Sequence, residues 1–153
     1  MVDSLLTSLG LYGATFAVAF IAGMLPIVSI ELFLVGATAL GADVHALPLL
    51  IAIAAIGHQI AKTITYYAGA GMFELPRGRM RERIEAAKAR IERWNRRPRL
   101  IMFAAAATGL PPLWALGFVA QPMMQMDIAT FTAITATGRI LRYSALVAIT
   151  TLF

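Results

Sequence analysis

The sequence predicts an all-helical integral membrane protein that forms a single domain over residues 1–153. Of the chain, 59% is hydrophobic and only 14% is charged, whereas soluble domains are about 45–50% apolar and roughly 25% charged. Ten of the thirteen Lys and Arg residues lie between Arg77 and Arg99, and the segments on either side are nearly free of charge. Long apolar segments joined by one basic loop are typical of a multi-pass membrane protein.

The first apolar segment, residues 5–25, is long enough to cross a bilayer, which takes about 20 residues of helix. Pro26 interrupts this segment, because proline lacks a backbone donor and clashes with the preceding helical turn. Residues 27–41 form a second apolar arm that is short for a full span. Glu31 lies inside this arm, and Asp43 closes it.

Residues 46–70 form the clearest span, with Tyr66 and Tyr67 at the end where an aromatic belt would meet the membrane surface. His58 and Lys62 are four residues apart in this span and therefore share one helical face. Lys62 has two interpretations of equal weight: a residue of the functional site, or a structural side chain that snorkels from the span to water.

Residues 77–99 are basic, and their apolar side chains recur at alternating steps of four and three, as on one helical face. These side chains are Met80, Ile84, Ala87, Ile91 and Trp94. The pattern fits a solvated helix that caps the structure, a helix in the lipid interface, or a short coiled coil. Two heptads are too few for a coiled coil, and Trp94 with the many arginines favours the interface. The charge predicts a cytoplasmic location and an anionic phospholipid partner rather than nucleic acid.

The second half of the chain begins with residues 100–121, an apolar segment that Pro111 and Pro112 break into two short arms. Residues 128–153 form the last predicted span. Asp127 immediately precedes that span, and we expect its side chain to cap the helix N-terminus.

The two halves follow one plan, with repeat 1 at about residues 5–70, an amphipathic linker at 71–99 and repeat 2 at about 100–153. The matching positions are Gly23 to Pro26 with Gly109 to Pro111, Asp43 with Asp127, and Gly57-His58 with Gly138-Arg139. Paired apolar segments interrupted by proline are a pointer to an inverted-repeat transporter and to its binding site. A chance match is the alternative.

Each broken segment is predicted to be a re-entrant hairpin whose tip lies near the middle of the membrane. Backbone groups freed by proline cannot face lipid, so they must be buried in protein or line a wet cavity. Two alternatives stay open: the prolines only kink continuous helices, or residues 5–25 cross fully and only the second segment is re-entrant.

In this order, the motifs resemble the VTT domain of the DedA superfamily over roughly residues 14–150. The shared features are a proline with a glutamate five residues on (Pro26, Glu31), an aspartate a dozen residues later (Asp43), a span with Gly and Tyr, a basic linker and a second proline-broken hairpin. The resemblance implies two facing re-entrant hairpins and a multi-pass protein of a bacterial-type inner (plasma) membrane. It further implies movement of phospholipids or polyprenyl-phosphate carriers between leaflets, in some branches with proton coupling.

One departure from the family pattern concerns the second hairpin. Many bacterial members have arginines beside its proline, whereas here the neighbours are Thr108 and Trp114. The nearest basic residues further along the chain are Arg139 and Arg142, which either substitute in space or mark a branch with a different headgroup.

Charges in the apolar segments are the candidate site residues, because a carboxylate at bilayer depth costs about 2.5–3.5 kcal/mol on insertion scales and so needs a partner. We expect Glu31 to face Arg139 and Arg142, and a lipid phosphate to compete for the same arginines. Asp43 is either a site residue nearer the mouth or a cap of the next helix. The predicted transport residues are Glu31, Asp43, Arg139, Arg142, Pro26, Pro111 and Pro112, with Lys62, His58 and Asp127 as secondary candidates.

The composition argues against enzyme chemistry and against bound cofactors. The chain has no cysteine, its two histidines have no partners at metal-ligand spacing, and it has no cluster of Ser, His and Asp. We therefore expect no metal and no cofactor. Three functions remain: a translocator of phosphate-bearing lipids, a small-solute or ion transporter, and a non-transporting membrane scaffold. A chain this short leaves open a homodimer that encloses the path.

Overall fold

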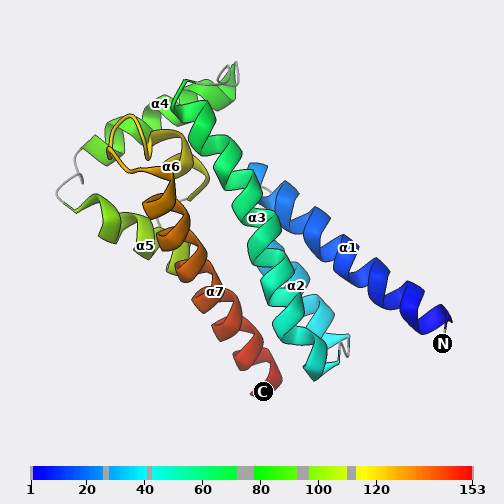
Figure 1. Cartoon of the computed structure of the whole chain (residues 1–153). Helices are drawn as coiled ribbons and strands as arrows, with labels where there is room; N and C mark the ends of the chain where they lie inside the picture. The colour runs from blue at the N-terminus through cyan, green and yellow to red at the C-terminus, as the bar shows by residue number, and fades with distance from the viewer. Residues whose placement is uncertain are drawn as a thin grey trace. The chain divides into compact units, whose positions relative to one another are not determined.

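The computed structural model describes residues 2–25, 28–40, 43–71, 78–92, 97–109 and 113–152. Within these ranges 84% of the residues are α-helical and none lies in a strand, which confirms the predicted all-helical class. The helices are α1 (Val2–Met24), α2 (Ile30–Ala39), α3 (Leu47–Gly69), α4 (Arg79–Glu92), α5 (Pro98–Thr108), α6 (Leu113–Val119) and α7 (Ile128–Leu152), with a short 3-10 turn (Val44–Ala46) before α3 (Figure 1).

Both predicted breaks are ends of helices rather than kinks. Leu25, Val28 and Ser29 are not helical, and Ser29 then starts α2 by accepting a hydrogen bond from the Leu32 N–H through its side chain, at 3.3 Å. Gly109 ends α5 in the left-handed conformation, with φ of +81°, where glycine carries no steric cost. Pro26, Pro111 and Pro112 themselves lie outside the described residues.

The chain forms two compact units whose boundaries differ from those of the predicted repeats. Unit 1 comprises Met1–Ala61 and Ile140–Phe153, and unit 2 comprises Lys62–Arg139. Unit 1 therefore contains the first hairpin, the beginning of α3 and the end of α7. Unit 2 contains the second hairpin, the end of α3 and the beginning of α7.

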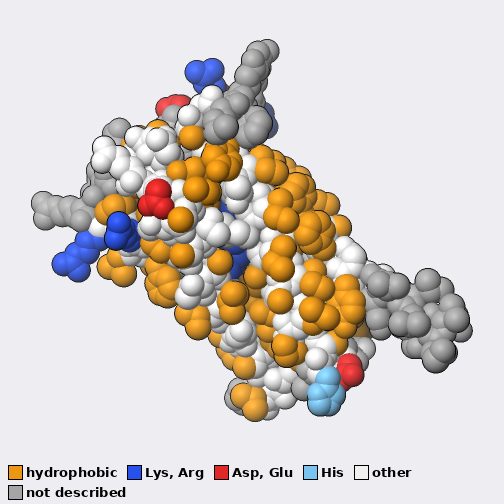
Figure 2. Space-filling model, in the orientation of Figure 1, with side chains coloured by type: hydrophobic (Ala, Val, Ile, Leu, Met, Phe, Trp, Pro, Cys, Tyr) orange, Lys and Arg blue, Asp and Glu red, His pale blue; other side chains and the backbone are white. Residues whose placement is uncertain are grey.

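Unit 1 has a core of small and aliphatic side chains from α1, α2, α3 and the end of α7. Its fully or nearly buried members include Ala19, Ile30, Leu34, Leu50, Ala54 and Tyr143. Small residues on α1 and α3 allow the two helices to approach closely. A Cβ placed on Gly57 would lie 2.8 Å from the backbone oxygen of Phe16. The exposed faces of α1 and α3 are covered by hydrophobic side chains (Figure 2).

Unit 2 has its own core, made by α5, α6, the start of α7 and the end of α3. Tyr66, Met102, Leu116, Val119 and Phe131 are buried in it. The Tyr66 hydroxyl donates a 2.8 Å hydrogen bond to the Met126 carbonyl, which ties the end of α3 to the turn before α7.

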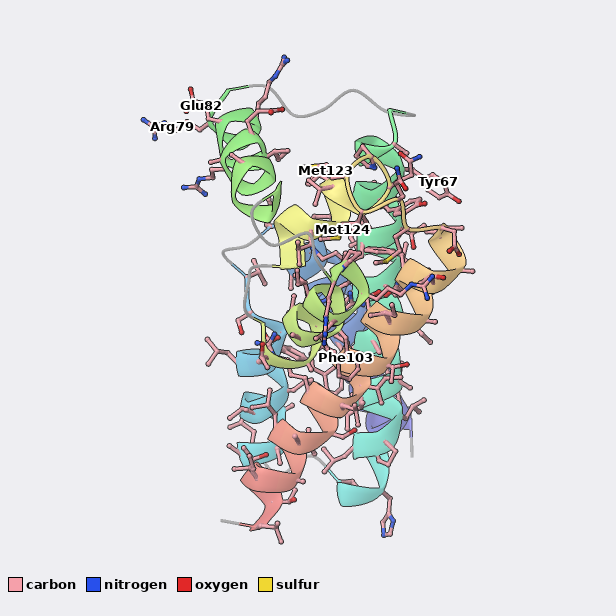
Figure 3. The ribbon with its side chains drawn as sticks, turned by 90° about the vertical axis from the view of Figure 1, so that its left-hand side faces the viewer. Tyr67, Arg79, Glu82, Phe103, Met123 and Met124 are labelled. Carbon is pink, nitrogen blue, oxygen red and sulfur yellow. The ribbon has the colours of Figure 1, made fainter. Side chains whose placement is uncertain are left out.

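The basic helix α4 packs on unit 2 through Ile84, which is fully buried with Ala68 and Phe118. Its described arginines are exposed, and Arg79 and Glu82 project away from the unit at the start of the helix (Figure 3). This contact is what a capping helix makes; the other side chains of the predicted apolar stripe lie outside the described residues.

The same glycine contact occurs once in each unit. In unit 2, a Cβ on Gly138 would lie 3.2 Å from the backbone oxygen of Phe103 and 2.7 Å from the Ala106 Cβ. In unit 1, a Cβ on Gly57 faces the backbone oxygen of Phe16 and the Cβ of Ala19. Gly57 of α3 and Gly138 of α7 are matching positions of the two predicted repeats. Each of them thus contacts a Phe-x-x-Ala segment in the first helix of the preceding hairpin.

Helix α3 is the one helix, among the described residues, that is long and apolar enough to cross a membrane. Helix α7 has the length, but its threonines together with Arg139 and Arg142 lower its hydropathy. The multi-pass arrangement therefore stays a prediction.

Candidate functional site

An ion pair between Glu31 and Arg142 is the central feature of unit 1. The Arg142 Nη2 lies 3.1 Å from the Glu31 Oε1, and the side chains of Arg142 and Glu31 are 30% and 21% exposed. The hydroxyl of Ser29 donates a 2.8 Å hydrogen bond to the other carboxylate oxygen, Oε2. The expectation that Glu31 faces an arginine of the last helix is confirmed for Arg142.

Local structure places both partners. Glu31 lies in the first turn of α2, where a negative charge interacts favourably with the helix dipole. Tyr143 and Val147 of α7 are buried in the same core as Ile30 and Leu34 of α2. This packing holds the end of α7 against α2 and brings Arg142 within reach of the carboxylate.

A second polar contact fixes the next residue of α7 to α3. Tyr143 is fully buried, and its hydroxyl lies 3.0 Å from the His58 Nδ1. Neighbouring residues of α7 therefore bind two different helices: Arg142 binds α2 and Tyr143 binds α3. The secondary candidate His58 thus has a structural role in unit 1, one helical turn away from the Lys62 of unit 2.

Tyr143→Phe is expected to lower the free energy of unfolding by about 1 kcal/mol, because the buried hydrogen bond to His58 is lost. Thermal unfolding in detergent measures the change. Tyr12→Phe is the matched control, since Tyr12 packs partly buried against the same core and the described residues give its hydroxyl no hydrogen bond. Equal effects of the two substitutions would contradict a specific role for the hydroxyl of Tyr143.

Unit 2 contains two buried cations, Lys62 of α3 and Arg139 of α7. They are 1% and 2% exposed, and their charges are close enough to interact. The snorkelling interpretation of Lys62 is therefore wrong, because the side chain is buried and does not reach the surface. Buried Thr65 and Thr135 lie on the same two helices, and their hydroxyls donate to backbone oxygens of their own helices at 2.9 and 2.7 Å.

Both aspartates of the predicted set act at helix starts. The Asp43 Oδ1 accepts a 3.0 Å hydrogen bond from the His45 N–H, in the turn before α3. The Asp127 Oδ2 accepts a 2.9 Å hydrogen bond from the Thr130 N–H, which confirms the predicted cap of α7. Both side chains are exposed. The contact with His45 agrees with the capping role of Asp43, and its role in a site stays a prediction.

Asp127→Ala is expected to lower the melting temperature at neutral pH, whereas Asp127→Asn should retain the cap. The backbone hydrogen bond from Thr130 lowers the pKa of Asp127 below 3.8, so its stabilising effect is present above pH 3.8 and is lost as the pH falls through the lowered pKa. Melting temperatures of the wild type and Asp127→Ala should therefore differ by a constant amount at neutral and mildly acidic pH and converge only below pH 3.8. A difference that persists unchanged in acid would contradict this assignment.

Sequence reasoning missed three features of the two units. Ser29 follows a recognisable helix-start pattern, with a carboxylate two residues later, and could have been found. The contact between Tyr143 and His58 and the proximity of Lys62 to Arg139 depend on how the helices are rotated about their axes, which the sequence does not reveal.

Comparisons of the chain with protein families, with curated proteins and with solved structures gave no match.

Proposed function

We propose that this chain is a DedA-like membrane protein that moves a phosphate-bearing lipid, a phospholipid or a polyprenyl-phosphate, between the leaflets of a membrane. The observation that carries the proposal is the ion pair of Glu31 and Arg142 at the start of the helix that follows the first break. The partial exposure of both side chains leaves the pair accessible to a ligand.

The chemistry of the pair suits a phosphate headgroup. A guanidinium presents two parallel N–H donors, which fit a carboxylate and a phosphate equally well. A lipid phosphate can therefore replace Glu31 on Arg142, while the Ser29 hydroxyl still binds the displaced carboxylate. When the headgroup leaves, Glu31 returns to Arg142, so that neither charge stays unpaired.

Helix lengths support a re-entrant second hairpin. Helices α5 and α6 contain 11 and 7 residues, so that at 1.5 Å per residue they extend about 16 and 10 Å, well short of the roughly 30 Å hydrocarbon core. Helix α1 contains 23 residues and extends about 34 Å, enough to cross. The length of α1 agrees with the alternative in which the first arm spans the membrane fully, although among the described helices α3 alone has both the length and the apolarity of a span.

Two features support an inverted repeat. The paired contacts of Gly57 and Gly138 repeat one packing plan, and each unit combines a hairpin with the end of the other repeat's long helix. Inverted repeats with broken helices are a common plan of membrane transporters. The basic helix α4 then lies on the cytoplasmic side, near anionic phospholipid.

Leaflet exchange in reconstituted liposomes tests the proposed function. A fluorescent phospholipid is placed in both leaflets, and a membrane-impermeant reductant bleaches the outer leaflet; active protein should make the inner-leaflet fluorescence decay as well. A trapped soluble dye that stays intact controls for leaks. Exchange no faster than in protein-free vesicles would contradict lipid transport, and uptake of a small solute instead would favour the second function.

A further inference from the structure

A small polar pocket lies in unit 2, where the first turns of α5 and α7 meet. Its volume is about 230 Å³, and Pro98, Arg99, Met124, Gln125, Asp127 and Thr130 contribute to its walls. The turn that leads into α7 shapes it: Gln125 has a positive φ of 48°, and the Met126 N–H donates to the Ala120 carbonyl at 3.0 Å.

The pocket carries one charge of each sign. Arg99 and Asp127 both line it, and in the part of the chain that the structure describes they form no salt bridge with each other. The Thr130 N–H binds one oxygen of Asp127, and this hydrogen bond lowers the pKa of the carboxyl, so that it is negative at neutral pH. The pocket thus offers a cation and an anion that are separated by space rather than paired.

We infer that this pocket binds a zwitterion that carries a phosphate and an ammonium group, with the phosphate on Arg99 and the ammonium on Asp127. Such a ligand bridges two opposite charges that do not reach each other. Arg99 lies in the first turn of α5, an 11-residue helix whose positive dipole end favours an anion. Pro98 and Met124 form an apolar wall for the methylene groups between the two charges.

The size of the pocket limits the ligand to a headgroup. Pockets for drug-sized ligands hold about 300–1,000 Å³, so this one is too small for acyl chains. The ligand is either the headgroup of a phosphatidylethanolamine whose chains stay in the bilayer or the free soluble headgroup. The inference does not depend on the proposed transport at Glu31, because Glu31 belongs to unit 1 and all residues that line the pocket belong to unit 2.

Ligand retention by the full-length chain, purified in detergent, tests the inference by native mass spectrometry. The probes are phosphatidylethanolamine, phosphatidylglycerol and soluble glycerophosphoethanolamine. Phosphatidylethanolamine should be retained better than phosphatidylglycerol. Arg99→Gln and Asp127→Asn should each weaken its binding roughly two- to fivefold, as expected for exposed charge contacts. Asp127→Asn preserves the helix cap, so its effect reports on the charge.

Arg97→Gln is the matched control, because it removes the same charge two residues earlier, from an exposed side chain that does not line the pocket. Its affinity for phosphatidylethanolamine should equal that of the wild type. Binding of the soluble headgroup supports a free ligand, and binding of the lipid alone supports a lipid ligand; both agree with the inferred chemistry. Equal retention of phosphatidylglycerol, no effect of Asp127→Asn, or equal effects of Arg97→Gln and Arg99→Gln would overturn it.

Discussion

Glu31→Gln is expected to slow leaflet exchange of a phosphate-bearing lipid by about tenfold or more. The substitution removes the charge that competes with the phosphate for Arg142, so the headgroup is released more slowly. A charge-assisted hydrogen bond contributes about 1.5–3 kcal/mol, and each 1.4 kcal/mol changes an equilibrium tenfold. Expression and thermal stability in detergent should change little, because partly exposed ion pairs contribute only about 0–1 kcal/mol to folding.

Two comparisons separate transport from folding in this prediction. Arg142→Gln should also lose exchange, but through weak binding of the headgroup rather than slow release. Glu82→Gln removes an exposed carboxylate of α4, in unit 2, and should exchange lipid normally. Normal exchange by Glu31→Gln would show that Glu31 is not the site. If Glu31→Gln loses exchange only because it no longer folds, the ion pair of Glu31 and Arg142 is structural. That result would favour the non-transporting membrane scaffold.

Gly69→Ala is expected to destabilise the protein by roughly 2–3 kcal/mol, the cost of overpacking a close helix contact. A Cβ on Gly69 would overlap the backbone of Phe118, including its carbonyl group. A backbone segment cannot turn aside as the end of a flexible side chain can, so α3 and α6 must separate. Chemical unfolding in detergent, followed by circular dichroism, measures the change.

Gly36→Ala serves as the control for the same substitution. Gly36 lies within α2, and a Cβ there would meet nothing within 4 Å. Alanine favours the helix over glycine by about 0.8–1.0 kcal/mol, so this variant should be slightly more stable than the wild type. If Gly69→Ala were as stable as Gly36→Ala, the close approach of α3 to Phe118 would be disproved.

The helices and their breaks were predictable because their signals are local. Long apolar runs, prolines near glycines, and a serine or aspartate before α2, before the turn that leads into α3 and before α7 define most boundaries within a few residues. The pairing of Glu31 with Arg142 was predictable for a different reason: an apolar segment can hold an isolated carboxylate only beside a cation or water.

Features that depend on tertiary packing were not predictable. Lys62 could be a residue of the functional site or a structural side chain that snorkels to water, and only the folded structure shows that the side chain is buried, near Arg139. Asp43 could belong to a site or cap the next helix, and the sequence does not show which groups lie around its carboxylate. Gly36 resembles the glycines that mediate helix contacts, yet nothing lies against it, whereas Gly57 and Gly69 do mediate such contacts.

The second hairpin lacks a counterpart of the charged pair. The position five residues after Pro111 is Leu116, which is buried in the core of unit 2. The repeat thus supplies one packing plan to both halves, while the proposed exchange of a carboxylate for a lipid phosphate on an arginine concerns the first hairpin.

We propose that Arg142 recognises the phosphate of a transported lipid, and the ratio of two exchange rates tests this recognition. Two fluorescent lipids with the same acyl chains, a phospholipid and a phosphate-free glycolipid, are exchanged in the same reconstituted vesicles by the wild type and by Arg142→Gln. The wild type should exchange the phospholipid about tenfold or more faster than the glycolipid, the effect of one charge-assisted contact, and Arg142→Gln should bring the ratio close to that of protein-free vesicles. Equal acceleration of both lipids by the wild type, or an unchanged ratio in Arg142→Gln, would contradict the account.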